Sequence, residues 1–89
     1  MTDSKHIWIF HGSGGRFASG VFENKELAET WVKKYHLQGI LTKYLINEGV
    51  YDWANRSQYF KPSKAAHLSS DFIQKFSLAS QEHYHYEDD

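Results

Sequence analysis

The sequence predicts a small α+β domain in which one helix packs against an antiparallel sheet of three strands. Two observations predict this class: strand-like runs at residues 7–10, 17–22 and 40–46, and a helical repeat of apolar positions at residues 25–36. A right-handed crossover from the second strand to the third would place the third strand beside the first. We therefore expect the topology ββαβ with the strand order 2-1-3.

The first two strands form a predicted hairpin. The run IWIF at residues 7–10 is apolar, β-branched and aromatic, which is typical of a central strand covered on both faces. A glycine-rich turn follows, and residues 17–22 then alternate between two faces. This pattern predicts a second strand from Phe17 to Phe22 that pairs with the first.

A helix is predicted from Lys25 to His36. Asn24 is a residue type that caps helices, and the carboxylate of Glu26 lies in the first turn, where the helix dipole favours a negative charge. Apolar side chains recur at helical spacing at Leu27, Ala28, Trp31, Val32 and Tyr35. Gly39 ends this pattern, and Ile40 to Ile46 alternates as a third strand would.

One or two short helices are predicted after the sheet. Beyond Gly49, a helical pattern precedes Pro62 and predicts a short helix. Its apolar positions are Val50, Trp53 and Ala54. Ser69 or Ser70 can cap a last helix. Its predicted inward positions are Phe72, Ile73, Phe76 and Ala79. The intervening residues 61–67 are typical of a loop.

Length and composition predict one domain. The chain has 89 residues, of which 40% are hydrophobic and 17% aromatic, enough for one packed core and too few for two. We expect a single domain over residues 1–89, with flexible ends at residues 1–4 and 87–89. The N-terminus shows neither the apolar region of a signal peptide nor a stretch long enough for a membrane span. We therefore expect a cytoplasmic protein with no membrane partner.

Cysteine content and charge narrow the function. Because there is no cysteine, thiolate metal sites, iron–sulfur clusters and cysteine nucleophiles are excluded. Residues 1–78 carry ten Lys and Arg against seven Asp and Glu, a charge of +3, whereas residues 79–89 carry four acids and no base. This body lacks the dense basic face that nucleic acids require, so we expect no nucleic-acid partner. No catalytic motif is complete, and we expect neither enzymatic activity nor a cofactor.

The glycine-rich loop is the first candidate site. Its residues are His11, Gly12, Ser13, Gly14, Gly15 and Arg16. Backbone N–H groups of such a loop can converge on an anion or small ligand, and an arginine can add a bidentate contact. The loop fails the dinucleotide fingerprint, because Phe17 stands where glycine or alanine is needed, and Ser13 does not fit a hydrolase elbow. The alternative is a hairpin turn that uses the conformational freedom of glycine.

The C-terminal segment, residues 81–89, is the second candidate site. It alternates histidine and tyrosine without an obvious partner strand, and we expect it to lie on the body of the domain. When extended, it points His83 and His85 the same way, as two imidazole ligands of a metal would. A third ligand would have to come from elsewhere in the fold. The alternatives are that Tyr84 and Tyr86 pack while the histidines face water, or that the segment docks in a pH-sensitive manner.

A surplus of aromatic residues suggests a third candidate, a surface for a protein partner. Tyrosine and tryptophan lead the hot spots of protein interfaces. Tyr51, Tyr59 and Phe60 surround a short predicted helix and a loop, and they are the candidate partner surface. The alternative is that most aromatic residues, which recur at helical and strand spacing, belong to the core.

Three tracts together resemble a family of small bacterial proteins of unknown function. They are HGSGGRFASGVF at residues 11–22, GVYDWA at residues 49–54 and SQEHYHYED at residues 80–88. The resemblance spans nearly the whole chain and implies a bacterial origin, but it implies no activity.

The sequence therefore predicts a non-enzymatic cytosolic binding module whose partner is another protein or a second copy of the chain. The alternative is a protein that binds a small ligand, an anion or a metal with the glycine-rich loop and the C-terminal segment together. One ligand shell can include both only if the fold brings them within about 10 Å of each other.

Overall fold

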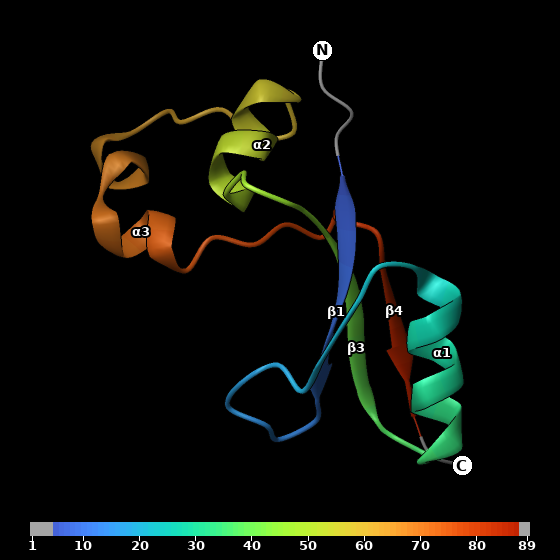
Figure 1. Cartoon of the computed structure of the whole chain (residues 1–89). Coiled ribbons are helices and arrows are strands. Elements are labelled where there is room, and N and C mark those ends of the chain that lie inside the picture. Colours follow the sequence, from blue (N-terminus) through green and yellow to red (C-terminus); the bar gives the residue numbers. More distant parts are fainter. Residues whose placement is uncertain (1–4, 88–89) are drawn as a thin grey trace. The chain divides into compact units, whose positions relative to one another are not determined.

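The computed structural model describes residues 5–87 of the protein, which form two compact units (Figure 1). Unit 1 consists of the chain up to Ile46 and from Gln81 onward, and unit 2 consists of Asn47–Ser80. The expectation of one domain over residues 1–89 stays a prediction. The ends expected to be flexible are residues 1–4 and 87–89. All of them except Glu87 lie outside the described part of the chain.

Unit 1 is built on a four-stranded sheet. Its strands are β1 (His6–Gly12), β2 (Gly20–Phe22), β3 (Gly39–Leu45) and β4 (His83–Tyr86). Their order is β2-β1-β3-β4, and each neighbouring pair is antiparallel (Figure 1). The α+β class and the order 2-1-3 of the first three strands are confirmed, with the apolar first strand inside the sheet.

The fourth strand is formed by the C-terminal segment, for which the sequence gives no obvious partner strand. β4 pairs with β3 in a register that joins His85 to Ile40 and Tyr84 to Leu41. Its alternation sends the tyrosines to one face of the sheet and the histidines to the other. The partner could not be predicted because it lies far away in the sequence, and the pattern of one short strand does not identify its neighbour.

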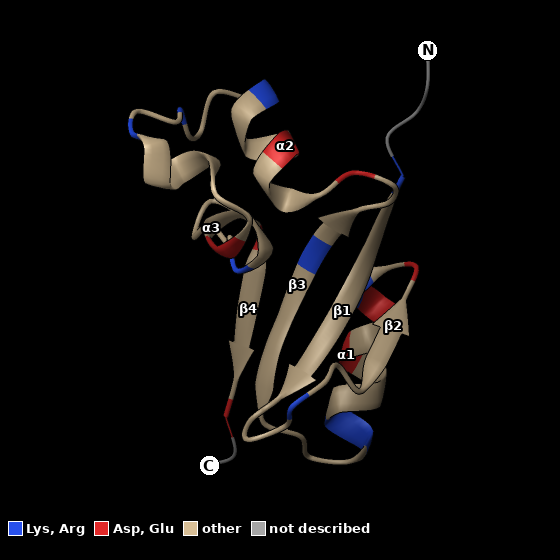
Figure 2. Ribbon diagram, turned by 90° about the vertical axis from the view of Figure 1, so that its left-hand side faces the viewer, with Lys and Arg blue, Asp and Glu red and all other residues tan. Residues whose placement is uncertain are grey.

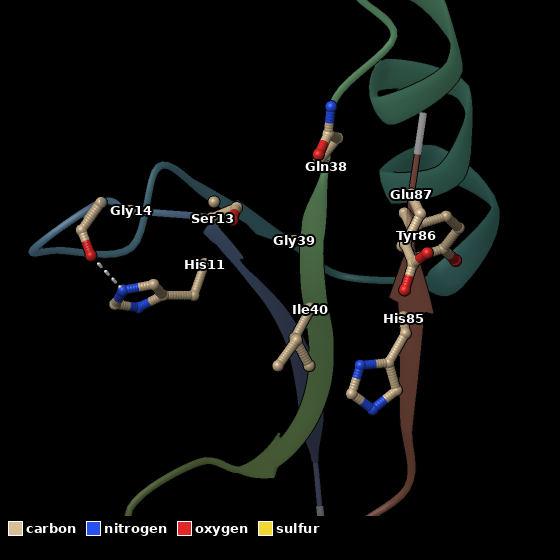
Figure 3. Close-up of a pocket in the computed structure, with 11 residues that line it drawn as sticks. His11, Ser13, Gly14, Gln38, Gly39, Ile40, His85, Tyr86 and Glu87 are labelled. Atoms are coloured by element: carbon tan, nitrogen blue, oxygen red, sulfur yellow. Dashed lines mark hydrogen bonds between the residues drawn. The ribbon is translucent and has the colours of Figure 1, made fainter. Parts of the chain in front are cut away.

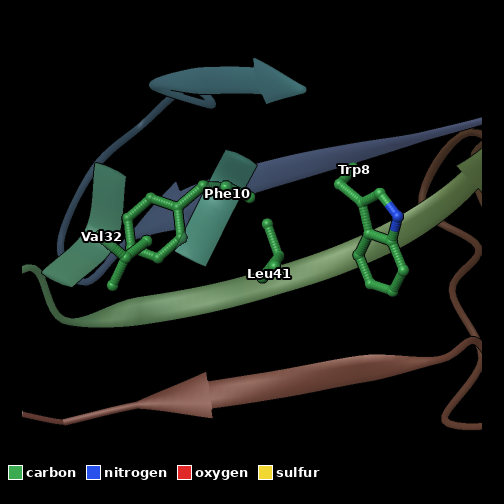
Figure 4. Packing of buried hydrophobic residues seen from close by; sticks show 5 residues of the cluster. Trp8, Phe10, Val32 and Leu41 are labelled. Carbon is green, nitrogen blue, oxygen red and sulfur yellow. The ribbon is translucent and has the colours of Figure 1, made fainter. Parts of the chain in front are cut away.

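The core of unit 1 lies between one face of the sheet and helix α1 (Lys25–Lys34) (Figure 4). The buried residues of this core are Trp8, Phe10, Ala28, Val32 and Leu41. Around them pack the partly buried residues Phe22, Trp31, Leu37, Tyr84 and Tyr86. Phe10 and Trp31 meet edge to face with ring centres 5.9 Å apart, a geometry that aromatic pairs favour. Aromatic rings thus fill much of a small core.

Helix α1 begins as predicted and ends early. The side-chain oxygen of Asn24 accepts the N–H of Leu27 at 2.9 Å and caps the helix. The helix ends at Lys34 because His36, its predicted last residue, has a left-handed backbone with φ 54°. Leu27 and Tyr35 belong to the apolar repeat that predicts the helix, but their side chains are 51% and 54% exposed. The sheet covers a narrower stripe of the helix than its apolar residues span.

Strand β2 is shorter than predicted. It begins at Gly20 rather than at Phe17. The N–H of Ser19 donates at 2.9 Å to the carbonyl of Phe10, which is already the partner of Gly20, so the regular ladder does not extend further back. Phe17 itself is 79% exposed and contributes no buried face that would lengthen the strand.

Unit 2 contains α2 (Val50–Arg56), the 3₁₀ helix η1 (Ala65–Leu68) and α3 (Ser70–Gln74). Both α-helices are predicted by the sequence, and the Oγ of Ser69 caps α3 by accepting the N–H of Phe72 at 3.1 Å. Helix η1 occupies part of the predicted loop. None of the helices in the described part of the chain combines the length and apolarity that a bilayer crossing requires.

An aromatic cluster fills unit 2. Its members are Tyr51, Phe60, His67, Phe72 and Phe76. The hydroxyl of Tyr51 donates to the carbonyl of His67 at 2.8 Å. Phe72 and Phe76 face inward as predicted, whereas Ile73 and Ala79 are exposed. The prediction fails at Ala79 because α3 ends after five residues, at Gln74.

Gly39→Ala should strongly destabilise unit 1. A Cβ at this position would collide with the backbone carbonyl oxygen of His11 and lie 2.8 Å from a ring carbon of Phe10. Because the obstacle includes backbone, β1 and β3 must separate, and we expect a loss of about 2–4 kcal/mol in the free energy of unfolding. Urea unfolding followed by tryptophan fluorescence measures this loss.

Gly14→Ala is the control for this prediction. Gly14 has φ +78°, but nothing lies within 4 Å of a Cβ built there. Its substitution should therefore cost only the backbone strain, about 1 kcal/mol. Equal losses in the two variants would show that the close approach at Gly39 does not constrain the sheet.

Candidate functional site

A hollow of about 480 Å³ in unit 1 brings together three segments that are distant in the sequence (Figure 3). Residues 11–15 of the glycine-rich loop form one side, residues 38–40 at the start of β3 form the middle, and residues 85–87 form the other side. The loop and the C-terminal segment therefore line one hollow, as the ligand-site hypothesis requires.

The register of the sheet explains this convergence. His11 pairs with Ile40, and Ile40 pairs with His85, so the three residues form one row across β1, β3 and β4 (Figure 3). Their side chains lie on the sheet face opposite to α1. With neighbouring strands about 4.8 Å apart, the backbones of His11 and His85 are roughly 10 Å apart. A single small molecule or peptide side chain can contact both.

The glycine-rich loop is a closed turn held by its own groups. The Nε2–H of His11 donates to the carbonyl of Gly15 at 2.6 Å, and the N–H of Gly15 donates to the carbonyl of Gly12 at 2.9 Å. The N–H of Ser13 donates to the carbonyl of Gln38 at 2.9 Å and fastens the turn to the start of β3. Residues 11–15 of the candidate set line the hollow, whereas Arg16, which the structure also describes, lies outside its lining.

The two histidines of the C-terminal segment lie side by side on β4. The ring centres of His83 and His85 are 5.2 Å apart. The Nδ1 of His83 carries a proton, because it donates to the carbonyl of Gln81 at 2.7 Å, so in the neutral ring the lone pair lies on Nε2. Within residues 5–87, no group of three or more His, Asp or Glu side chains is placed to hold a metal ion.

The two tyrosines of β4 bind it to the rest of unit 1. The hydroxyl of Tyr86 donates to the Glu29 carboxylate on α1 at 2.6 Å, and the hydroxyl of Tyr84 donates to the Glu82 carboxylate at 2.6 Å. Burial, followed by the bond to Glu29, holds the pKa of Tyr86 well above its ordinary value. The bond from Tyr84 lowers the pKa of the Glu82 carboxyl. The bond to Glu29 and the packing of both tyrosines against the core anchor the strand that carries His83 and His85.

The candidate partner surface belongs to unit 2, and its three residues are not equally exposed. Tyr51 and Phe60 are half-buried members of the aromatic cluster, with ring centres 6.1 Å apart. Tyr59 is 56% exposed and packs against Trp53, with ring centres 5.2 Å apart. Tyr59 therefore has the most ring area free for a partner, and the surface stays a prediction.

Gln38 and Ile40 line the hollow but belong to neither candidate segment of the sequence. The sequence signal for them is Gly39, which lies between them, because a glycine in a strand marks a place where another backbone approaches closely. Here that backbone belongs to His11, at the start of the loop.

The fold is that of a small α+β protein with a four-stranded antiparallel sheet, and the hollow lies at one end of this sheet. The chain belongs to the family described as Domain of unknown function (DUF7710), whose model matches residues 7–89. The predicted membership of a family of unknown function is thereby confirmed, and the matched range includes the whole hollow. No curated protein and no solved structure matches the chain.

The Tyr86 contact should make unit 1 sensitive to alkali. Because the pKa of Tyr86 is raised in the folded state, the hydroxyl keeps its proton where the unfolded chain releases it, near pH 10.0. The contribution of the Tyr86–Glu29 bond to the free energy of unfolding is therefore complete below pH 10 and is lost as the pH rises further. Tyr86→Phe should lower the free energy of unfolding by about 1 kcal/mol at pH 7. Above pH 10, the free energy of unfolding of this variant should fall less steeply with pH than that of the wild type.

Urea unfolding at a series of pH values measures both effects. Tyr35→Phe is the control, because Tyr35 is exposed at the end of α1. If the two variants follow the same pH dependence, the Tyr86–Glu29 bond does not contribute as argued.

Proposed function

We propose that the protein is a non-enzymatic binding module of the bacterial cytoplasm, which takes up an extended segment of a protein partner along the outer edge of β4. The observation that carries this proposal is the open backbone edge of β4, which ends at the hollow. Strand addition of this kind gains affinity from main-chain hydrogen bonds and specificity from neighbouring pockets.

The hydrogen-bond ladder of β4 determines which backbone groups are free. The N–H of Lys43 donates to the carbonyl of Glu82 at 3.0 Å, just before β4 begins. In an antiparallel ladder every second residue bonds to the same neighbour, so Tyr84 and Tyr86 bond toward β3. His83 and His85 then direct their N–H and C=O groups away from β3. In the described sheet, no strand lies beyond β4.

The two edges of the sheet differ in how well they resist pairing. β2 offers three residues, and a short edge strand is a poor template for a partner. β4 is longer by one residue, and like β2 it contains neither lysine nor proline, the residues that commonly block an edge. Figure 2 shows β4 at the outer side of the sheet and without a charged residue along its length. The edge of β4 is therefore the more receptive one.

The hollow would add specificity to this edge. A strand laid along β4 would carry a side chain past His85 to the end of the sheet, where the hollow begins. Its lining combines the apolar side chain of Ile40 with the polar side chains of Gln38 and Glu87. Such a lining favours a partner side chain with an apolar stem and a polar end.

A peptide bound to this edge should protect the amides of His83 and His85 from hydrogen exchange. The probe is a peptide selected with the full-length protein from a displayed library of random sequences, in the presence of EDTA. In the free protein these two amides should exchange fast and those of Tyr84 and Tyr86 slowly, and the peptide should slow the fast pair. A selected peptide that leaves both histidine amides unprotected would overturn the proposal.

Two edge variants provide matched controls. His85→Pro removes an outward N–H and should weaken the peptide roughly tenfold, about 1.4 kcal/mol. Val21→Pro on the other edge should leave peptide binding unchanged. Val21 lies opposite Ile9, and the backbone groups of Ile9 bond to β3 rather than to β2. The N–H of Val21 therefore points outward from the sheet, where proline is tolerated. His85→Ala keeps the N–H but changes the lining of the hollow, so it should lose less affinity for the peptide than His85→Pro does.

A second candidate function is the binding of a small polar molecule in the hollow. It is favoured by the one observation that the glycine-rich loop and the C-terminal segment line the same hollow. A library of small polar fragments that includes inorganic phosphate should shift the NMR signals of the Ser13 and Gly14 amides and the Ile40 methyl groups. Gln38→Ala should weaken any such fragment, while the selected peptide should still protect the amides of His83 and His85. If no fragment shifts these signals, the hollow is not a ligand site.

A further inference from the structure

We propose that two copies of this chain pair through β4, and that His83 and His85 of both copies hold one zinc ion between them. This inference rests on the proposed function of the β4 edge, and it identifies a second copy of β4 as the segment that the edge takes up. Each chain supplies two of the four ligands, so the metal site is complete only in the pair.

One chain already presents half of a zinc site. Two imidazoles on one tetrahedral zinc ion, each with its nitrogen about 2.0–2.1 Å from the metal, have ring centres roughly 5 Å apart. The rings of His83 and His85 are 5.2 Å apart, and their planes are inclined by 75°, so they do not stack. The bond from the Nδ1 of His83 to the Gln81 carbonyl fixes the tautomer whose Nε2 can bind a metal. Bonds of this kind commonly orient ligand histidines.

The remaining ligands have to come from another chain. Zinc takes four ligands in structural sites, and the described part of one chain holds no group of three or more side chains that could bind a metal. The row next to the β4 histidines on their own sheet offers Ile40 and Thr42, which are the strand partners of His85 and His83. On the other side lies the open edge, so a second β4 can bring two more imidazoles.

The sequence of β4 suits a symmetric antiparallel pair. When Tyr84 lies opposite Tyr84 of the second copy, His83 lies opposite His85 of that copy, and the reverse holds as well. The outward N–H and C=O groups of both histidines then meet across the pair, as the alternation of the ladder requires. Directly opposite residues have Cβ atoms about 4.5–5.5 Å apart, which gathers four imidazoles on one face. A shift by one residue would place histidines opposite tyrosines and mix the two faces.

No like charges oppose each other in this register. Glu82 would lie opposite Tyr86 of the second copy, and its carboxylate already has Lys43 at 3.5 Å and the Tyr84 hydroxyl at 2.6 Å. Gln81 would lie opposite Glu87 of the second copy. All four tyrosines stay on the face that packs against α1 in each copy. The paired edge thus forms a continuous sheet with the zinc ion on the opposite face.

Native mass spectrometry and sedimentation velocity of the full chain test the proposal, with zinc chloride or EDTA as the only variable. Zinc should produce a species of two chains and one zinc ion, and should lower the dissociation constant of the dimer at least roughly tenfold. The double variant H83A/H85A should stay monomeric in zinc. The matched control H6A/H36N also removes two exposed histidines, with asparagine suited to the φ of 54° at position 36, and should dimerise as the wild type does.

Each other outcome overturns the inference. Zinc bound to a single chain would show that the second copy is not needed, and a dimer of the same strength in EDTA would show that the metal is not needed. Misfolding of the double variant would also abolish the dimer. The hydrogen exchange of the Tyr84 and Tyr86 amides is therefore measured alongside, because it stays slow only when β4 is folded. If the wild type stays monomeric in zinc while a selected peptide still protects His83 and His85, the inference fails and the proposed function stands.

Discussion

Unit 1 depends on the close approach of β3 to the end of β1. At Gly39 the backbone of β3 lies so near to His11 and Gly12 that no side chain fits between them. This contact favours one register, in which Gly12 faces Gly39 and every later pair of β1 and β3 follows. The same register aligns Ile40 with His11 on one side and with His85 on the other. The composition of the hollow is thus a consequence of where one glycine allows two strands to meet.

Strand β4 separates its structural and its binding groups by the alternation of its residues. Tyr84 and Tyr86 join the core, and Tyr86 also bonds to α1 through Glu29. These contacts hold the strand in place without help from the rings of His83 and His85, of which the first bonds to the neighbouring Gln81 carbonyl. Neither histidine belongs to the core, so both rings are available for a ligand. A strand of four residues can in this way serve both the fold and the binding that we propose for its edge.

Features decided by near neighbours in the chain could be predicted from the sequence, and features decided by distant ones could not. The cap at Asn24 depends on residues within one helical turn, and the sequence predicts it correctly. The exposure of Leu27 and Tyr35 depends on how wide a stripe of α1 the sheet covers, which periodicity does not reveal. The loop and the histidines were identifiable as candidates by residue type. Their meeting at Ile40 was not, because it depends on the pairing of three strands.

The order of the elements links the stability of β4 to what binds its edge. The chain leaves unit 1 after β3 and returns only after unit 2, so the pairing of β4 with β3 closes a long loop. Loop closure costs conformational entropy, which rises by only about 0.6 kcal/mol for each doubling of the loop. The tyrosine contacts and the β3 ladder offset this cost. A further strand on the free edge adds a second ladder to β4, so binding there and order in β4 reinforce each other. For this reason we expect a change that loosens Tyr86 from Glu29 to weaken a strand bound to the β4 edge as well.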